Sequence, residues 1–178
     1  MELTDVMRTT FSCRDWTEEP VDDATIHRIL DVARFAPNGG NRQGWHVIII
    51  RDPDTRAQLS ALTEPAAKRY IAQTQAGESP WNSVDPTSVS AETIAQTPAP
   101  AHLTEPVRQA AVVLLVCVDL KVVASIDQNL DRVGVISGGS VYPFVWNVLM
   151  AARHEGYGGT LTTLAVAQEP QIQALLGI

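Results

Sequence analysis

The sequence predicts one domain that mixes several α-helices with a few short β-strands. Segments with apolar residues at helical spacing alternate along the chain with short runs of β-branched residues. A length of 178 residues suits a single core, and 45% hydrophobic with 19% charged residues is ordinary for a soluble globular protein. We therefore expect one domain over residues 1–178, without internal repeats.

Helix signals occur in four places. A helix over residues 22–36 begins at the capping residue Asp22 and ends before Pro37, and its apolar residues follow the helical period. A long helix is expected after Ser140 as its N-cap, with Pro143 in the first turn, where a missing N–H costs little. The two remaining helices are expected after Asp52 or Asp54 and over residues 169–178.

Strand signals are fewer. WHVIII, residues 45–50, reads as a short strand, and AAVVLLVCV, residues 110–118, reads as a strand buried on both faces. GGTLTTL, from Gly158, is a glycine-led entry to extended chain. Residues 74–106 are rich in Pro, Ser, Thr and Ala, which predicts a mobile excursion with a short helix near Ala91 to Gln96.

Composition argues against several functional classes. A net charge of -7, with no stripe of basic residues, argues against a nucleic-acid surface. No apolar run approaches the roughly 18 to 20 residues that span a bilayer, and the N-terminus lacks the apolar region of a secretory signal. Cys13 and Cys117 have neither metal-binding nor redox spacing, so we expect a reduced, cytoplasmic protein. The histidines show no ligand spacing and no Gly-x-Gly-x-x-Gly follows a strand, so neither a metal site nor a Rossmann domain is expected.

Three polar segments predict the binding site, two of them rich in glycine and one containing Ser and Arg. They are residues 8–16 (RTTFSCRDW), residues 38–43 (NGGNRQ) and residues 156–163 (GYGGTLTT). Glycine lets a flat ligand or a phosphate approach the backbone amides, and Asn and Gln can both donate and accept. Arg and Ser suit a phosphate or a carbonyl oxygen. Together they indicate a polar, planar, phosphorylated ligand.

At these segments the chain resembles the nitroreductase family of FMN-dependent oxidoreductases, from about Met7 to its last residue. The family pattern Arg-Arg-Ser-x-Arg-x-Phe corresponds to TFSCRDW, residues 10–16. The pattern Ala-Pro-Ser-x-x-Asn-x-Gln-Pro-Trp corresponds to APNGGNRQGW, residues 36–45. The family's Asn-containing helix, followed by Gly-x-Gly and a strand, corresponds to residues 147–160. Three patterns in the family's order make the resemblance specific.

The resemblance implies an α+β fold: a nitroreductase-like, small, mostly antiparallel sheet flanked by helices, in a homodimer with flavin sites at its interface. It implies FMN as the cofactor and NAD(P)H as the co-substrate, in a ping-pong reduction of nitroaromatic, quinone or similar acceptors. No catalytic side chain is implied, because the flavin N5 takes up the hydride. The segment from Gln75 to Pro106 would be a lid that sets acceptor choice.

The resemblance also implies which residues contact FMN. Ser12 and Arg14 would contact it, with Arg14 near the pyrimidine end, where a cation stabilises the charge of the reduced ring. The amides around Gly158 and Gly159 would face the N5 side. Asn41 would hydrogen-bond the pyrimidine edge. The other residues expected along that edge are Pro37, Asn38 and Gly39.

Several positions depart from the family pattern. Gln43 would still hold the loop or the ribityl chain, but Thr10 stands where the family has an arginine, and Arg8 is the alternative cation for the FMN phosphate. Gly44 replaces the usual proline and is expected to loosen the entry to the strand. Family members continue past LLGI into a further strand and a basic residue, so we expect that a tail is missing from these 178 residues.

Other interpretations stay open at this point. A reductive dehalogenase or flavin-cleaving branch of the same fold would change the chemistry, and a non-catalytic flavin-binding protein would remove it. Ser12 could simply cap a turn, and Arg14 could pair with Asp15 on the surface. Trp45 and Trp146 are expected in the core, and Cys13 is expected to be a packed residue.

Overall fold

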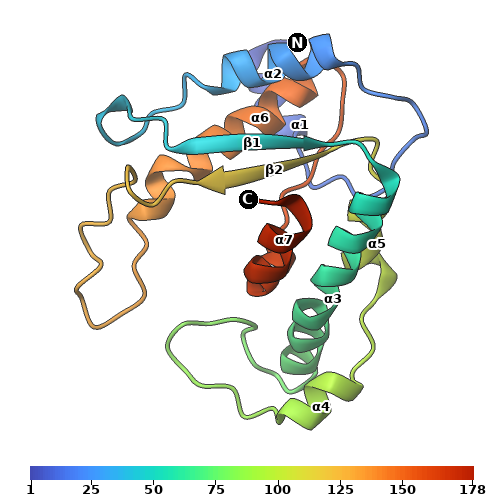
Figure 1. Cartoon of the computed structure of the whole chain (residues 1–178), viewed down its shortest axis with the longest axis vertical. Coiled ribbons are helices and arrows are strands. Elements are labelled where there is room, and N and C mark those ends of the chain that lie inside the picture. The colour runs from blue at the N-terminus through green and yellow to red at the C-terminus, as the bar shows by residue number, and fades with distance from the viewer. The chain divides into compact units, whose positions relative to one another are not determined.

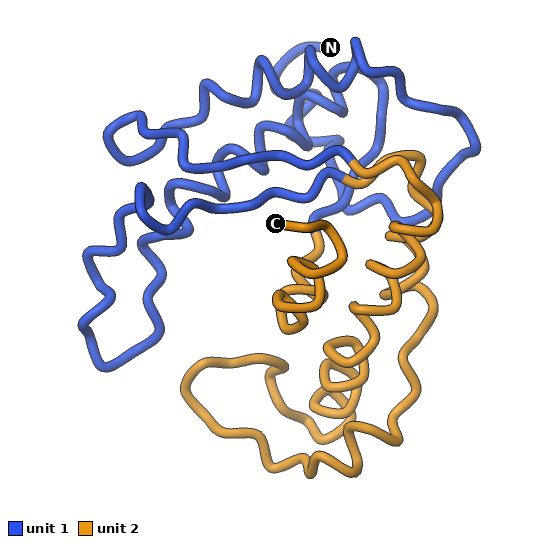
Figure 2. The backbone as a smooth tube through the Cα atoms, in the orientation of Figure 1, with its two compact units in different colours: residues 1–49, 114–161 blue, residues 50–113, 162–178 orange.

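The computed structural model describes residues 1–178, which form two compact units (Figure 2). The first unit comprises residues 1–49 and 114–161, and the second comprises residues 50–113 and 162–178. No helix combines the length and the apolar character needed to cross a membrane. The helices and strands, labelled in Figure 1, are α1 (Leu3–Thr9), α2 (Asp23–Ala33), β1 (Trp45–Ile50), α3 (Pro53–Gln75), α4 (Ala91–Gln96), α5 (Ala101–Gln109), β2 (Val113–Val118), α6 (Tyr142–His154) and α7 (Glu169–Leu176).

The first unit is built on a two-stranded sheet, β1 paired with β2, and on helices α1, α2 and α6. The strands run antiparallel: Asp119 N, just after β2, donates to the Gly44 carbonyl, just before β1, at 2.8 Å. The core forms around Ala33, the end of α2, and Phe144 of α6, and the Trp45 ring stacks on Phe144 with centroids 4.6 Å apart. Because alanine is small, α2 and α6 can approach closely over this stack. The α+β fold with a small antiparallel sheet is therefore confirmed, as is the core position of Trp45.

α6 differs from the predicted helix at both its cap and its outer face. It begins at Tyr142, and the Ser140 hydroxyl does not cap it but accepts a hydrogen bond from Gly39 N at 3.1 Å. Pro143 lies in the first turn as expected. Trp146 is 43% exposed, so its predicted burial is wrong. The apolar residues of this helix are more numerous than its packing within the chain requires.

β2 is also less buried than its composition predicts. Its residues Val113 to Cys117 are half-buried and Val118 is exposed. The prediction of burial on both faces is wrong, since no residue of β2 is fully buried. The sheet has only two strands, so each also has one unpaired edge. An apolar strand sequence alone cannot report how many neighbours the strand will have.

The second unit is organised by the long helix α3. Asp52 caps it, accepting from Thr55 N at 2.7 Å, and small side chains along its buried face include Ala66, Ala67 and Ala72. α5 is fastened to it by the Ser60 hydroxyl, which donates to the Thr104 carbonyl at 2.9 Å. Small residues on α3 therefore allow the other helices of this unit to pack closely on it.

Residues 74–106 are more structured than the predicted mobile excursion. The short helix α4 has the predicted bounds, but α5 was not expected, and α3 itself extends to Gln75. Glu78 ties down the turn between α3 and α4: its carboxylate accepts from Ser88 N at 2.7 Å and from the Thr87 hydroxyl at 2.7 Å. These hydrogen bonds lower the pKa of Glu78 to about 2. A carboxylate held in this way closes the segment into a defined loop.

Candidate functional site

The structure brings two of the three polar segments together in the first unit. Ser12 and Gly159 form a parallel β-bridge, and Cys13 N donates to the Gly159 carbonyl at 3.1 Å. A Cβ at Gly158 would lie 3.0 Å from both Cβ and Sγ of Cys13, so glycine is needed for this approach. We call the group Ser12, Arg14, Gly158, Gly159 and Thr160 the bridge half-site.

The bridge half-site carries polar groups without partners in the chain. The Thr160 hydroxyl oxygen is buried and makes no hydrogen bond. Arg14 donates only to the carbonyl of Ser12, at 3.3 Å, so the alternative of a surface pair with Asp15 is wrong. Arg8 lies on α1, exposed and without an ion pair. A buried hydroxyl and two cations without carboxylates favour an anionic, hydrogen-bonding ligand.

The third polar segment, residues 38–43, forms a tight loop that we call the loop half-site. Asn38 organises it: its Oδ1 accepts from Gln43 N at 2.9 Å, and its Nδ2 donates to the Ala36 carbonyl at 3.1 Å. Gln43 Nε2 donates to Asn41 Oδ1 at 3.2 Å, which leaves the amide nitrogen of Asn41 free at an exposed position. Asn41 and Gln43 have φ of 50° and 49°, a left-handed conformation that non-glycine residues seldom adopt.

The loop half-site rests on the segment that joins β2 to α6. Gly39 N donates to Ser140 Oγ, and Arg42 donates to the Val122 carbonyl at 3.4 Å. A Cβ at Gly44 would lie 2.7 Å from Val122 Cγ2, so this glycine permits close packing. The expectation that Gly44 loosens the strand entry is therefore wrong: it is buried, and the chain packs tightly against it.

Within one chain the two half-sites contact different parts of α6. The loop half-site contacts Ser140, two residues before the helix. The bridge half-site lies beside the middle of the helix, because a Cβ at Gly159 would lie 2.8 Å from Leu149 Cδ2. With a rise of 1.5 Å per residue, the stretch from Ser140 to Leu149 corresponds to about 14 Å. No hydrogen bond joins the Asn41 side chain to Ser12.

The hollow beside the bridge half-site is too small to enclose a cofactor. Thr9, Leu149, Arg153, Tyr157 and the two glycines line it, and its volume is about 20 Å³. Ligand-binding pockets of drug-sized molecules have volumes of roughly 300 to 1,000 Å³. The hollow is therefore much smaller than a pocket that encloses a drug-sized molecule.

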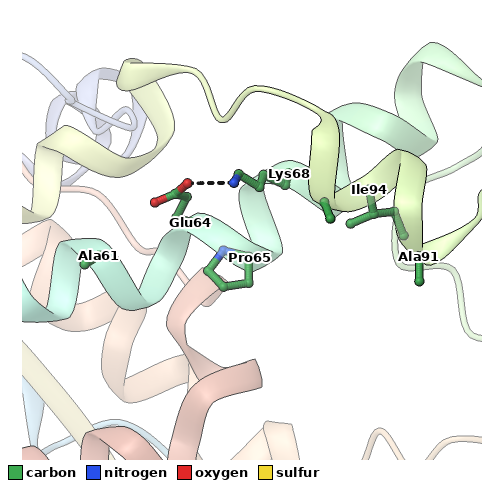
Figure 3. A pocket seen from close by; sticks show the side chains of 7 residues that line it. Ala61, Glu64, Pro65, Lys68, Ala91 and Ile94 are labelled. Atoms are coloured by element: carbon green, nitrogen blue, oxygen red, sulfur yellow. Dashed lines mark ion pairs between the residues drawn. The ribbon is translucent and has the colours of Figure 1, made fainter.

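A larger groove lies in the second unit, between α3 and α4 (Figure 3). Its volume is about 520 Å³, and the Glu64–Lys68 ion pair, at 2.8 Å, lies on its α3 side. Pro65 and Ile94 give it an apolar lining, and it contains none of the predicted site residues. Its lining is mainly apolar, with one ion pair, and so lacks the hydrogen-bonding groups that the rim of a flavin would need. The volume of a groove alone therefore does not identify the binding site.

The structure gathers no group of three histidine, cysteine or acidic side chains that could hold a metal ion. Burial raises the pKa of the Cys117 thiol, which keeps it in the neutral, unreactive form. The sequence predicted Ser140 only as a helix cap, and it gave Thr160 no role of its own within the segment 156–163. Thr160 directly follows Gly159 and could have been predicted as the next residue of the same segment. The hydrogen bond from Gly39 N to Ser140 joins residues 101 positions apart, so no local pattern in the sequence predicts it.

These observations describe an α+β protein in which the polar, glycine-containing segments form two separate groups along α6. The chain belongs to the nitroreductase family, whose model matches residues 7–178. It is 36% identical over 50 residues to a candidate NADH dehydrogenase/NAD(P)H nitroreductase of Burkholderia lata, covering 28% of this chain and 26% of that protein. It is 36% identical over 76 residues to the 5,6-dimethylbenzimidazole synthase of Rhodobacter capsulatus, covering 43% of this chain and 36% of that protein.

A solved structure agrees with the fold. A candidate nitroreductase from Desulfovibrio desulfuricans, in complex with FMN, superimposes with a TM-score of 0.65 at 20% sequence identity. The superposition covers 99% of this chain and 76% of that one. The matched stretches span about a quarter to a third of the two curated relatives. The family and the fold are thus shown.

Proposed function

We propose that this chain is an FMN-dependent oxidoreductase that uses NAD(P)H to reduce an electron-poor acceptor such as a nitroaromatic or a quinone. The observation that carries the proposal is the bridge between Ser12 and Gly159, which joins two of the polar segments beside the orphaned hydroxyl of Thr160. The Desulfovibrio relative with FMN and the Burkholderia relative named for NAD(P)H support the cofactor and the co-substrate.

The bridge half-site fits one side of FMN. Ser12 and Arg14 have donors without acceptors in the chain, and the orphaned Thr160 hydroxyl can donate or accept. Gly158, where a side chain would strike Cys13, leaves the backbone accessible to a flat ring. Arg14 would hold negative charge at the pyrimidine end. Arg8, exposed and unpaired, would hold the phosphate in place of the family arginine at Thr10.

The loop half-site fits the pyrimidine edge of the ring. Asn41 would donate its free amide N–H to a ring carbonyl, and Gln43 would hold Asn41 in that orientation through their 3.2 Å bond. Asn38 would act mainly by shaping the loop, since both ends of its amide are engaged with backbone. Pro37 and Gly39 would line the same edge. The loop is therefore preorganised for binding before any ligand arrives.

Because the half-sites contact different parts of α6 on one chain, at Ser140 and at Leu149, we infer that two chains complete the site. In a two-fold dimer, the loop half-site of one protomer can meet the bridge half-site of its partner, and the reverse pair forms by symmetry. Each homodimer would hold two FMN molecules at its interface. The apolar residues Tyr142 and Trp146, exposed on α6, suit such an interface.

When bound, FMN would supply the redox chemistry between NAD(P)H and the acceptor. The residues of this chain would bind and orient the ring, and Arg14 would place a fixed cation at the end where charge develops. No side chain of the half-sites is required as a nucleophile. NAD(P)H and the acceptor would occupy the same ring face in turn.

The test is flavin binding followed by turnover. The purified chain, mixed with FMN, should become yellow and oxidise NAD(P)H when a nitroaromatic or a quinone is added. Arg14→Ala and Asn41→Ala should each weaken FMN binding about tenfold or more, since a hydrogen bond to a charged group contributes about 1.5 to 3 kcal/mol. Arg34→Ala, which removes an exposed arginine of α2 paired with Asp31, is the matched control. A chain that takes up no FMN contradicts the proposal.

A second candidate function follows from the likeness to the 5,6-dimethylbenzimidazole synthase of Rhodobacter capsulatus. Such a branch of the fold would consume bound flavin in place of passing its electrons to an external acceptor. Loss of the flavin absorption in air, after reduction by NAD(P)H and without recovery, would favour this reaction. Full recovery of the spectrum over repeated cycles would favour the oxidoreductase.

A further inference from the structure

One residue in the wall of the hollow beside the bridge half-site is charged. Arg153, in the last turn of α6, is half-buried and lines the hollow together with Gly158 and Gly159 of the half-site. Arg8 and Arg14, the two cations expected from the sequence, do not line it. The charge in the hollow therefore comes from a residue that no sequence pattern singled out.

The guanidinium of Arg153 is oriented by one hydrogen bond. Its Nε donates to the Thr9 hydroxyl at 3.0 Å, and that hydroxyl donates in turn to the Asp5 carbonyl at 2.6 Å. Nη1 and Nη2 donate to no group of the chain. They carry four of the five N–H donors of the planar guanidinium, which can bind two oxygens of one anion. Arg153 is thus held by the chain and keeps its terminal donors for a ligand.

Arg153 also has no carboxylate partner. Carboxylates pair with Arg28, Arg34, Arg108 and Arg132. No acidic residue lines the hollow, so the positive charge of Arg153 is not neutralised there. An oriented arginine without a counter-ion, beside a polar half-site, favours an anionic ligand that accepts several hydrogen bonds.

The other polar side chains of the α1 wall are already engaged as donors. The Thr9 hydroxyl donates to Asp5, and the Thr10 hydroxyl donates to the Val6 carbonyl at 2.7 Å. The hollow, of about 20 Å³, accepts a group of about the size of one water molecule. One oxygen of a phosphate has that size, and the rest of the group would remain outside the hollow, where Nη1 and Nη2 of Arg153 are free to donate.

We propose that Arg153 binds the phosphate of FMN, with Thr9 as the residue that positions its guanidinium. The inference rests on the proposed function, which supplies a phosphorylated flavin as the ligand. A phosphate monoester carries a charge of about -1.5 to -2 at pH 7, more than one arginine neutralises, so Arg153 complements Arg8. Thr10, which stands where the family has an arginine, lines the same hollow as Arg153.

The first experiment uses riboflavin, which has the ring and the ribityl chain of FMN and lacks the phosphate. Quenching of flavin fluorescence gives the two dissociation constants. Arg153→Gln should raise that of FMN at least about tenfold, as expected when charge-assisted hydrogen bonds are lost, and that of riboflavin less than about twofold. An unchanged FMN constant, or an equal rise for both flavins, overturns the inference.

Two further substitutions separate ligand binding from a structural role. A cation at the C-terminal end of a helix is stabilised by the helix dipole without any ligand. Arg34→Gln removes such a cation from the end of α2 and should change neither constant. Thr9→Val keeps the charge of Arg153 and removes its hydrogen bond, so the FMN constant alone should rise about two- to tenfold. An unchanged FMN constant in Thr9→Val overturns the role of Thr9.

The phosphate of a different ligand is the competing occupant. NADPH carries a phosphate that NADH lacks. If Arg153→Gln leaves the FMN constant unchanged and raises the KM of NADPH above that of NADH, the residue binds the co-substrate and the inference is overturned. A wild type that binds neither flavin contradicts the proposed function itself, whereas a wild type and an Arg153→Gln variant that bind FMN equally contradict only the role of Arg153.

If Arg153→Gln does not fold, chemical modification of the wild type decides. Phenylglyoxal modifies arginine side chains, and peptide mass spectrometry measures the rate at each one. FMN should slow the modification of Arg153 at least about threefold, the protection expected when the ligand occupies the guanidinium in most molecules, and leave that of Arg34 unchanged. Riboflavin should not protect Arg153. Absence of protection by FMN, or equal protection by riboflavin, overturns the inference.

Discussion

At the scale of single residues, the loop half-site contains two non-glycine residues in a backbone conformation that such residues seldom adopt. Asn41 and Gln43 both lie at positive φ, where a non-glycine residue costs of order 1 to 3 kcal/mol unless its surroundings hold it. Asn tolerates that region, and Gln43 is held there by the bond from its N–H to Asn38. The hydrogen bonds of Asn38 and Gln43 therefore hold the strained loop in a conformation that leaves the Asn41 side chain exposed.

Gly44 offers a direct test of close packing at the strand entry. Gly44→Ala should destabilise the protein by about 1 to 3 kcal/mol, because the added Cβ would lie 2.7 Å from Val122 Cγ2 and 3.0 Å from Val123 Cγ2. Urea denaturation monitored by circular dichroism measures the loss. Gly139→Ala is the matched control: no atom lies within 4 Å of its Cβ position, so its stability should be close to that of the wild type. An equal effect of the two substitutions would contradict this account.

At the scale of elements, the sequence predicted a helix correctly where the segment has a capping side chain at its start or apolar residues at helical spacing. α2 begins after the predicted capping residue Asp22, and α4 has the predicted bounds Ala91–Gln96. α1 and α5 escaped prediction for physical reasons. α1 has no side-chain cap and buries only Val6, and α5 has Pro106 inside it, so neither carries the usual signal.

The candidate site was predictable in its parts and not in its arrangement. The residue types at Ser12, Asn41 and Gly158 indicated a polar, planar ligand, and the Ser12–Gly159 bridge now joins two of those segments. The place of the bridge half-site along α6 follows from the packing of Gly159 on Leu149, and the support of the loop half-site follows from the hydrogen bond of Gly39 N to Ser140. Both depend on contacts between distant positions, which no local pattern in the sequence contains.

Glu78 makes the stability of the loop after α3 depend on pH. Its pKa of about 2 in the folded chain lies below its ordinary value of 4.5, so the native state favours the ionised form. That stabilisation is complete above about pH 5 and is lost as the pH falls from 4.5 toward 2. Glu78→Gln should therefore be less stable than wild type at pH 7, with a difference that shrinks in acid. Thermal melting from pH 7 to pH 3 measures it, and a constant difference would contradict the mechanism.

At the scale of the whole molecule, the central question is whether a flavin site belongs to one chain or to two. The two half-sites contact α6 at different places, at Ser140 and at Leu149, and the hollow at the bridge half-site, about 20 Å³, cannot hold a tricyclic ring. A site shared between protomers has a consequence that a site within one chain cannot have. Two defective chains, each damaged in a different half-site, can together form an intact site.

Arg14→Glu damages the bridge half-site, and Asn41→Asp damages the loop half-site while keeping a residue that tolerates positive φ. Each variant alone should bind little FMN. After the two are unfolded together and refolded at equal concentrations, half of the dimers should be mixed, and each mixed dimer should contain one undamaged site of two. The mixture should then bind about a quarter of the FMN that the wild type binds, measured by absorbance after gel filtration.

The control is a mixture of the same variants refolded separately and combined just before the measurement, which should bind no more than either variant alone until subunits exchange. Recovery in the co-refolded sample requires that Arg14 of one protomer and Asn41 of its partner serve the same ligand. If co-refolding restores nothing although mass analysis finds mixed dimers, each site is formed by one chain. The placement of the two half-sites at different parts of α6 would then describe separate binding regions.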